Sequence, residues 1–193
     1  MVVSKTDILE FTDWKNSMSN NLRLINETTT TAGANAVNVL NVFSDDFSVY
    51  KIVTANLMAN NSTASGANLR LIEGENTVIT DAYYYAQQAQ KAETSFSYNN
   101  STDEEQIFNF FNSIDDSGQA GSSVGYIYNP YQSYYTMIQY ESIGRPGGNL
   151  RSYKGSGLYA QTTEITGFQI DLNESAGEFA GGGLIRTFGI RID

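Results

Sequence analysis

Carboxylates are the side chains of this chain best suited to chemistry, and they cluster at residues 45–46, 103–105 and 115–116. Adjacent carboxylates in a loop supply the hard oxygen ligands that Ca²⁺ prefers. No cluster fits the calcium-loop pattern, because Asp115-Asp116-Ser117-Gly118 lacks a glutamate at the required downstream spacing. We therefore favour solvated loop acids over calcium ligands and predict no metal site.

Other catalytic groups are scarce, because the chain contains neither histidine nor cysteine. Serine triads, cysteine–histidine dyads and histidine-containing metal sites all need one of these residues. A glycosidase needs two carboxyl groups that face each other across a groove, and sequence spacing does not show which two acids meet. We predict a protein that is not an enzyme and uses no cofactor.

The charge of the chain limits its partners. Eleven Lys and Arg stand against 21 Asp and Glu, which gives a net charge of −10. Such a surface repels nucleic-acid phosphates and anionic lipid headgroups, so we predict no nucleic-acid and no membrane partner. The N-terminus has no hydrophobic signal region, which predicts synthesis in a cytosol.

Tyrosine is abundant, with 13 residues. In a strand, Tyr83 and Tyr85 would face one side of the sheet and Tyr84 the other. Packing is the interpretation we favour for most of these rings, but exposed tyrosines also make platforms for sugars or proteins. If they form a binding surface, the first candidates are Tyr131, Tyr134 and Tyr135, which follow the turn at Pro130.

The N-terminal segment has a helical pattern between residues 4 and 24. Its apolar side chains recur at steps of three and four, and they are Ile8, Phe11, Trp14, Met18 and Leu22. They either pack on the rest of the chain or dock on a neighbouring subunit, where aromatic anchors are common. Residues 26–38 are polar and of low complexity and predict a linker, so we divide the chain into an arm and linker (1–42) and a domain (43–193).

Beyond the linker, the apolar pattern changes to alternation, which is typical of strands. Gly- and Asn-rich turns separate eight expected strands, at residues 47–57, 67–73, 78–86, 123–128, 134–141, 151–161, 167–172 and 184–192. Residues 87–112 are ambiguous. This spacing predicts a mainly β domain, an antiparallel β-sandwich of jelly-roll or lectin-like type, behind a short N-terminal helical arm.

Short sequence motifs in three of these strands also resemble those of a known protein family. Tyr50-Lys51-Ile52 precedes Asn56-Leu57, Leu69-Arg70-Leu71 follows, and Gly189-Ile190 lies in the last strand. Over residues 43–193 the chain resembles virion structural proteins of tailed bacteriophages, common in phages of marine bacteria. The resemblance implies a β-sandwich displayed on the head or tail of a phage particle. It carries over no catalytic residues.

Together these observations predict a virion protein made in the host cytoplasm, most simply a capsid decoration or cement protein. Its partners would be major capsid or tail subunits and further copies of itself, with a trimer as one expected oligomer. The alternative is a tail-fibre or head-fibre adhesin that binds a host receptor or glycan.

Overall fold

The computed structural model of the chain describes residues 21–60, 65–92, 96–114, 120–145, 149–172 and 177–192. These ranges contain thirteen strands, and every pairing between them is antiparallel. The strands are β1 (Leu22–Thr29), β2 (Ala36–Val39), β3 (Val49–Leu57), β4 (Ser65–Glu73), β5 (Thr77–Val78), β6 (Tyr83–Lys91), β7 (Ser97–Glu104), β8 (Ile107–Ile114), β9 (Gly121–Tyr128), β10 (Thr136–Gly144), β11 (Arg151–Tyr159), β12 (Ile165–Leu172) and β13 (Leu184–Ile190). The predicted mainly β, antiparallel class is confirmed.

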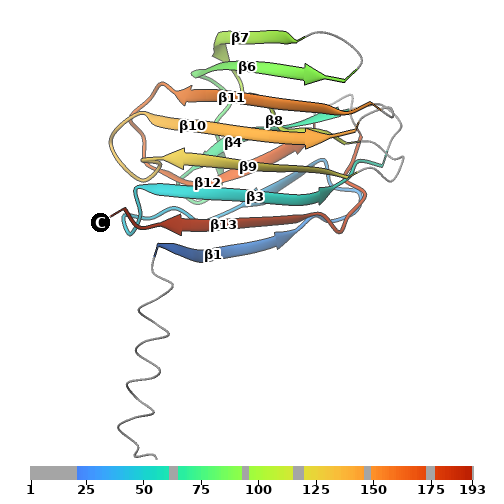
Figure 1. The fold of residues 1–193 in the computed structure, drawn as a ribbon. Helices are drawn as coiled ribbons and strands as arrows, with labels where there is room; N and C mark the ends of the chain where they lie inside the picture. The colour runs from blue at the N-terminus through green and yellow to red at the C-terminus, as the bar shows by residue number, and fades with distance from the viewer. Residues whose placement is uncertain are drawn as a thin grey trace, which may run out of the picture.

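The strands form two sheets. The large sheet has eight strands in the order β1-β13-β3-β9-β10-β11-β6-β7, and the small sheet joins β2, β12, β4 and β5, with β8 paired to β4. The large sheet lies in front of the small one in Figure 1. The hydrophobic core contains side chains from both sheets, so one face of each sheet is apolar.

Inward and outward side chains alternate along the strands, and the inward ones form this core. In β10 the burial pattern is strictly alternating, so Ile138 and Tyr140 point inward while Met137 and Gln139 point outward. Aromatic rings fill the space between the sheets: Phe110 of β8 lies 5.0 Å from the ring of Tyr140. A Cβ atom at Gly125 would lie 2.2 Å from the Phe110 ring, so glycine at this inward position makes room for the phenylalanine.

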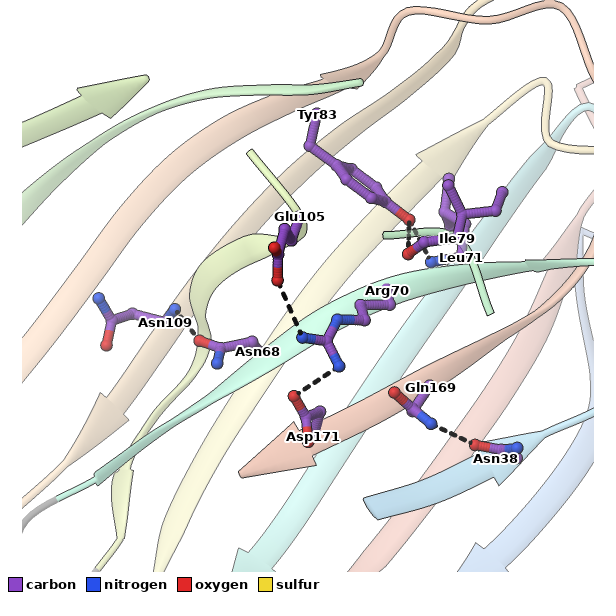
Figure 2. Close-up of polar contacts among 10 residues, drawn as sticks. All are labelled: Asn38, Asn68, Arg70, Leu71, Ile79, Tyr83, Glu105, Asn109, Gln169 and Asp171. Atoms are coloured by element: carbon purple, nitrogen blue, oxygen red, sulfur yellow. Dashed lines mark hydrogen bonds and ion pairs between the residues drawn. The ribbon is translucent and has the colours of Figure 1, made fainter. Parts of the chain in front are cut away.

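Polar contacts connect the two sheets and brace the small one (Figure 2). The hydroxyl of Tyr83, in the large sheet, accepts a hydrogen bond from the backbone N–H of Leu71 in the small sheet at 2.6 Å. On the small sheet, Arg70 forms an ion pair with Asp171 at 3.0 Å, and Glu105 lies 4.0 Å away on its other side.

In the described ranges, no helix is long and apolar enough to span a membrane.

The predicted helical arm falls mainly outside the described residues, which begin at residue 21. The helix prediction is wrong for its last apolar position, because Leu22 begins β1, whereas docking through Leu22 stays a prediction. The predicted linker at residues 26–38 is also wrong, since most of it lies in β1 and β2, which pair with β13 and β12. Main-chain hydrogen bonds hold these strands in the sheets, and such bonds need no apolar sequence.

Two other predictions are corrected in detail. The expected strand at 78–86 is two elements, β5 and β6, separated by a turn in which Ala82 has a φ of +61°. The ambiguous residues 87–112 contain the end of β6, the whole of β7 and most of β8. β7 has no fully buried residue, so it shows no alternation that a sequence pattern could reveal.

Candidate functional site

The outward face of the large sheet is the candidate site. No element among the described residues covers this face (Figure 1). In an antiparallel sheet, directly paired residues point to the same face and lie side by side. Paired outward residues therefore form rows that cross the strands, and the strand register fixes the members of each row.

The central row carries short side chains at its two middle positions, Ala86 and Ser156. Asn100 of β7 pairs with Ala86 of β6, Ala86 with Ser156 of β11, and Ser156 with Gln139 of β10. We call these four residues the small row. Ala86 and Ser156 fill little space above the sheet, so they form the floor of a depression.

Longer side chains flank the small row on both sides. The apolar row consists of Tyr84, Leu158, Met137 and Tyr128, which are paired in this order across β6, β11, β10 and β9. The charged row consists of Tyr98, Gln88, Lys154 and Glu141, paired across β7, β6, β11 and β10. The result is a groove of about 1150 Å³ that runs across the strands.

Tyrosine and amide side chains make up much of the lining of the groove. The Tyr98 side chain is 78% exposed and that of Tyr84 is 41% exposed, so both rings are accessible. The hydroxyl of Tyr128 donates a hydrogen bond to the Gln139 amide oxygen at 3.3 Å, which orients one wall against the floor. Such a surface offers flat apolar rings beside hydrogen-bonding amides.

The one charged side chain that lines the described groove is matched by a neighbour. Lys154 Nζ lies 2.8 Å from Glu141 Oε1, at the rim of the groove. The hydrogen bond and the charge of Glu141 raise the pKa of Lys154. Lys154 therefore keeps its positive charge at neutral pH, and the neighbouring Glu141 offsets this charge at the rim of the groove.

A second depression of about 590 Å³ lies on the other side of the charged row. Outward residues of the next row line it, including Gln90, Ser152 and Ile143, which are paired across β6, β11 and β10. Lys154 and Glu141 border this second depression as well. The accessible surface thus continues over the ion pair.

The tyrosines expected to form a binding surface lie elsewhere. Tyr134 and Tyr135 are 66% and 49% exposed in the segment between β9 and β10, while Tyr131 is half-buried against the core. None of the three lines the groove. The groove tyrosines were missed because Tyr84 and Tyr98 lie on different strands and only their register brings them to one site.

The acidic clusters show no metal-binding geometry in the part of the chain that the structure describes. Within these ranges, no group of three or more Asp, Glu, His or Cys side chains is placed to hold an ion. Asp45 and Asp46 are exposed, and residues 115–116 lie outside the described ranges.

No protein-family model, curated protein or solved structure matches this chain.

Proposed function

We propose that this chain is a non-catalytic recognition domain that binds a carbohydrate chain in the groove of the large sheet. The observation that carries this proposal is the small row, a floor of Ala86 and Ser156 between walls that bear Tyr84 and Tyr98. Sugar rings present apolar C–H faces that pack on aromatic rings, and hydroxyl groups that hydrogen-bond to amides. The groove offers both kinds of partner.

The charges favour a neutral carbohydrate. Glu141 neutralises Lys154 beside the groove, and the whole chain carries a net charge of −10. An acidic polysaccharide would be repelled by that charge and would have to compete with Glu141 for Lys154. A neutral chain meets neither obstacle.

The lining also supports a binding role over a hydrolytic one. Among the described lining residues of the groove there is no Asp or Glu, and Glu141 stands alone at its rim. Hydrolysis of a glycoside normally requires two carboxyl groups on opposite sides of the bond. A reducing-sugar assay on the bound polysaccharide tests this point, and release of reducing ends would contradict it.

For the setting, we propose the surface of a phage particle, on the resemblance of residues 43–193 to virion structural proteins. The jelly-roll or lectin-like form of the sandwich belongs to the same proposal. Of the two roles expected there, the groove favours a head-fibre or tail-fibre adhesin that contacts a host glycan.

Binding of the full chain to an array of neutral bacterial and algal glycans tests the proposal. Tyr84→Ala and Tyr98→Ala should each weaken binding about two- to tenfold, since losing one aromatic contact costs about 0.5–1.5 kcal/mol. Tyr134→Ala is the matched control, because its ring is as accessible but lies outside the groove. Loss of binding in Tyr134→Ala alone would instead assign the sugar to the segment between β9 and β10.

Capsid decoration is the second candidate, supported by apolar side chains at the β1 edge. Leu22 and Leu24 of β1, which follow residues 1–20 in sequence, are 46% and 50% exposed, and Ile192, which follows β13, is 71% exposed. Deleting residues 1–20 spares β1 and should abolish incorporation into particles if these residues dock on the shell. Normal incorporation of the shortened protein would contradict docking through this segment.

A further inference from the structure

The charged row continues beyond the groove, across the outward face of the large sheet. Its pairing runs from β11 through β10, β9, β3 and β13 to β1, so six consecutive strands each contribute one outward side chain (Figure 1). In this order the side chains are Lys154, Glu141, Val124, Val53, Arg186 and Glu27. We call this set the long charged row.

The charges of the long charged row are antisymmetric about its centre. Two valines form the centre, and an ion pair lies on each side of them. Lys154 lies 2.8 Å from Glu141 on one side, and Arg186 lies 2.6 Å from Glu27 on the other. From β11 to β1 the signs are plus, minus, plus and minus, so in the reversed row every charge meets its opposite. The row is therefore complementary to itself, as the surface of a twofold-symmetric dimer must be.

We infer that a second copy of this chain packs on the outward face of the large sheet. The twofold axis lies in the plane of this face, parallel to the strands and between β9 and β3. It places β9 on β3, β10 on β13 and β11 on β1 of the second copy. Glu141 then faces Arg186 of the second copy, and Lys154 faces Glu27 in the same way. Sheets that pack face to face keep their strand directions within about 30° of each other, which this axis satisfies.

The apolar row matches a second copy in the same register. It also continues to β1, through Val49, Ile190 and Leu22. When the row is reversed, Met137 lies opposite Ile190 of the second copy. Leu158 lies opposite Leu22 in the same way. Met137 and Leu22 are 55% and 46% exposed in the single chain, so the contact would remove apolar surface from water.

The face also has the size and the charge that association needs. Six strands about 4.8 Å apart and about eight residues long cover about 750 Å². Each partner of a stable complex buries about 800 Å². In β11 to β1 the outward charged side chains are the four of the long charged row and Lys51, so three cations and two carboxylates give a net charge of +1. The whole chain carries −10, so two copies repel each other less on this face than elsewhere.

One consequence rests on the proposed function. Met137 and Leu158 belong both to the dimer interface and to the lining of the groove. A glycan and the second copy would therefore compete for these side chains. Added glycan should shift the protein from dimer to monomer, and a glycan that binds without this shift would contradict the interface.

Charge reversal tests the interface in sedimentation equilibrium of the full chain, which should be a dimer at micromolar concentration. Glu141→Arg and Arg186→Glu should each weaken dimerisation at least about tenfold, because each places two like-charge pairs between the copies. Mixed in equal amounts, the two variants should form a heterodimer about as tight as the unaltered dimer. In that heterodimer the introduced arginine of one variant faces the introduced glutamate of the other. Circular dichroism checks that both variants fold.

Arg23→Glu is the matched control. It makes the same change in net charge as Arg186→Glu and also lies at an exposed position, in β1. Arg23 pairs with Gly189, which is buried on the inward side of β13, so its side chain leaves the sheet on the opposite face. This variant should dimerise like the unaltered protein.

Four results would overturn the inference. The unaltered chain could sediment as a monomer or as a trimer. Both single variants could remain dimers. Their mixture could stay monomeric although each variant is folded. The Arg23→Glu control could lose the dimer as fully as Arg186→Glu. These measurements need no ligand, so absent glycan binding would contradict only the proposed function.

Discussion

The hydroxyl of Tyr83 accepts a hydrogen bond from the backbone N–H of Leu71 at 2.6 Å, and this contact links β6 of the large sheet to β4 of the small one. The Tyr83 side chain is fully buried, and its hydroxyl donates in turn to the carbonyl of Ile79 at 3.4 Å. One side chain thus satisfies a main-chain group of β4 and another in the segment between β5 and β6. The large sheet is held against the small sheet by polar contacts as well as by apolar packing.

Tyr83→Phe should destabilise the fold by about 1–3 kcal/mol, because it leaves the buried Leu71 N–H without its acceptor. Chemical denaturation at neutral pH measures the change. Tyr84→Phe is the control, since the neighbouring ring points to the outward face and is 41% exposed. Its free energy of unfolding should stay within about 0.5 kcal/mol of the unaltered protein. Equal loss in both variants would contradict the special role of Tyr83.

Buried tyrosines predict a loss of stability at alkaline pH. Burial raises the pKa of Tyr83 and of Tyr140 above the ordinary value of 10.0. Above about pH 10 the unfolded chain releases these protons more readily than the folded chain, so the free energy of unfolding falls as pH rises. Below that pH both states are protonated and this contribution is constant.

Denaturation midpoints measured from about pH 8 to about pH 11 test this dependence. Tyr83→Phe should show a shallower decline above pH 10 than the unaltered protein, because one titrating group is gone. An unaltered decline in that variant would assign the alkaline transition to other groups.

Gly125→Ala should destabilise the chain by about 1–3 kcal/mol or more, since overpacking a core strains side chains and backbone. The added Cβ would lie 2.2 Å from the Phe110 ring, and β9 is flanked on both sides by paired strands. Thermal or chemical unfolding measures the loss. Ser156→Ala, on the outward face of β11, removes one exposed oxygen and should change stability little. Tolerance of Gly125→Ala would mean that Phe110 can move.

Asp171→Ala should cost about 1–3 kcal/mol, between the values typical of exposed and of buried ion pairs. The side chains of Arg70 and Asp171 are only 20% and 16% exposed, so the guanidinium would lose a partner that water replaces poorly. Glu105→Ala is the control, because its carboxylate is 73% exposed and lies 4.0 Å from the same guanidinium. Urea denaturation of both variants checks the difference, and equal effects would contradict it.

The sequence predicted the central strands well because their two faces differ. β3, β9, β10 and β13 have alternating burial, and each lies between two neighbours in the large sheet. The edge strands escaped prediction for the opposite reason: most side chains of β1 and β7 face water, so their residues follow no period. β8 escaped because a short apolar run such as Ile107–Phe111 fits a buried helix or strand equally well.

The groove depends on register, which composition does not contain. Ala86 and Ser156 are 70 positions apart in sequence, and only the pairing of β6 with β11 makes them neighbours. A shift of one residue in that pairing would point the outward side chains of one strand to the opposite face of the sheet. Ala86 and Ser156 would then no longer lie side by side. The sequence did indicate that Tyr84 faces away from Tyr83 and Tyr85, because that follows from strand geometry alone.

Filling the floor tests the groove without touching its walls. Ser156→Tyr places a ring above an exposed position, so stability should change by no more than about 0.5 kcal/mol. Glycan affinity should fall at least about tenfold, because the ring occupies the space that the sugar needs. Thr77→Tyr adds the same ring to an exposed position of β5 on the small sheet and should bind like the unaltered protein. Calorimetric titration of both variants decides the matter: full binding by Ser156→Tyr would move the ligand away from the small row.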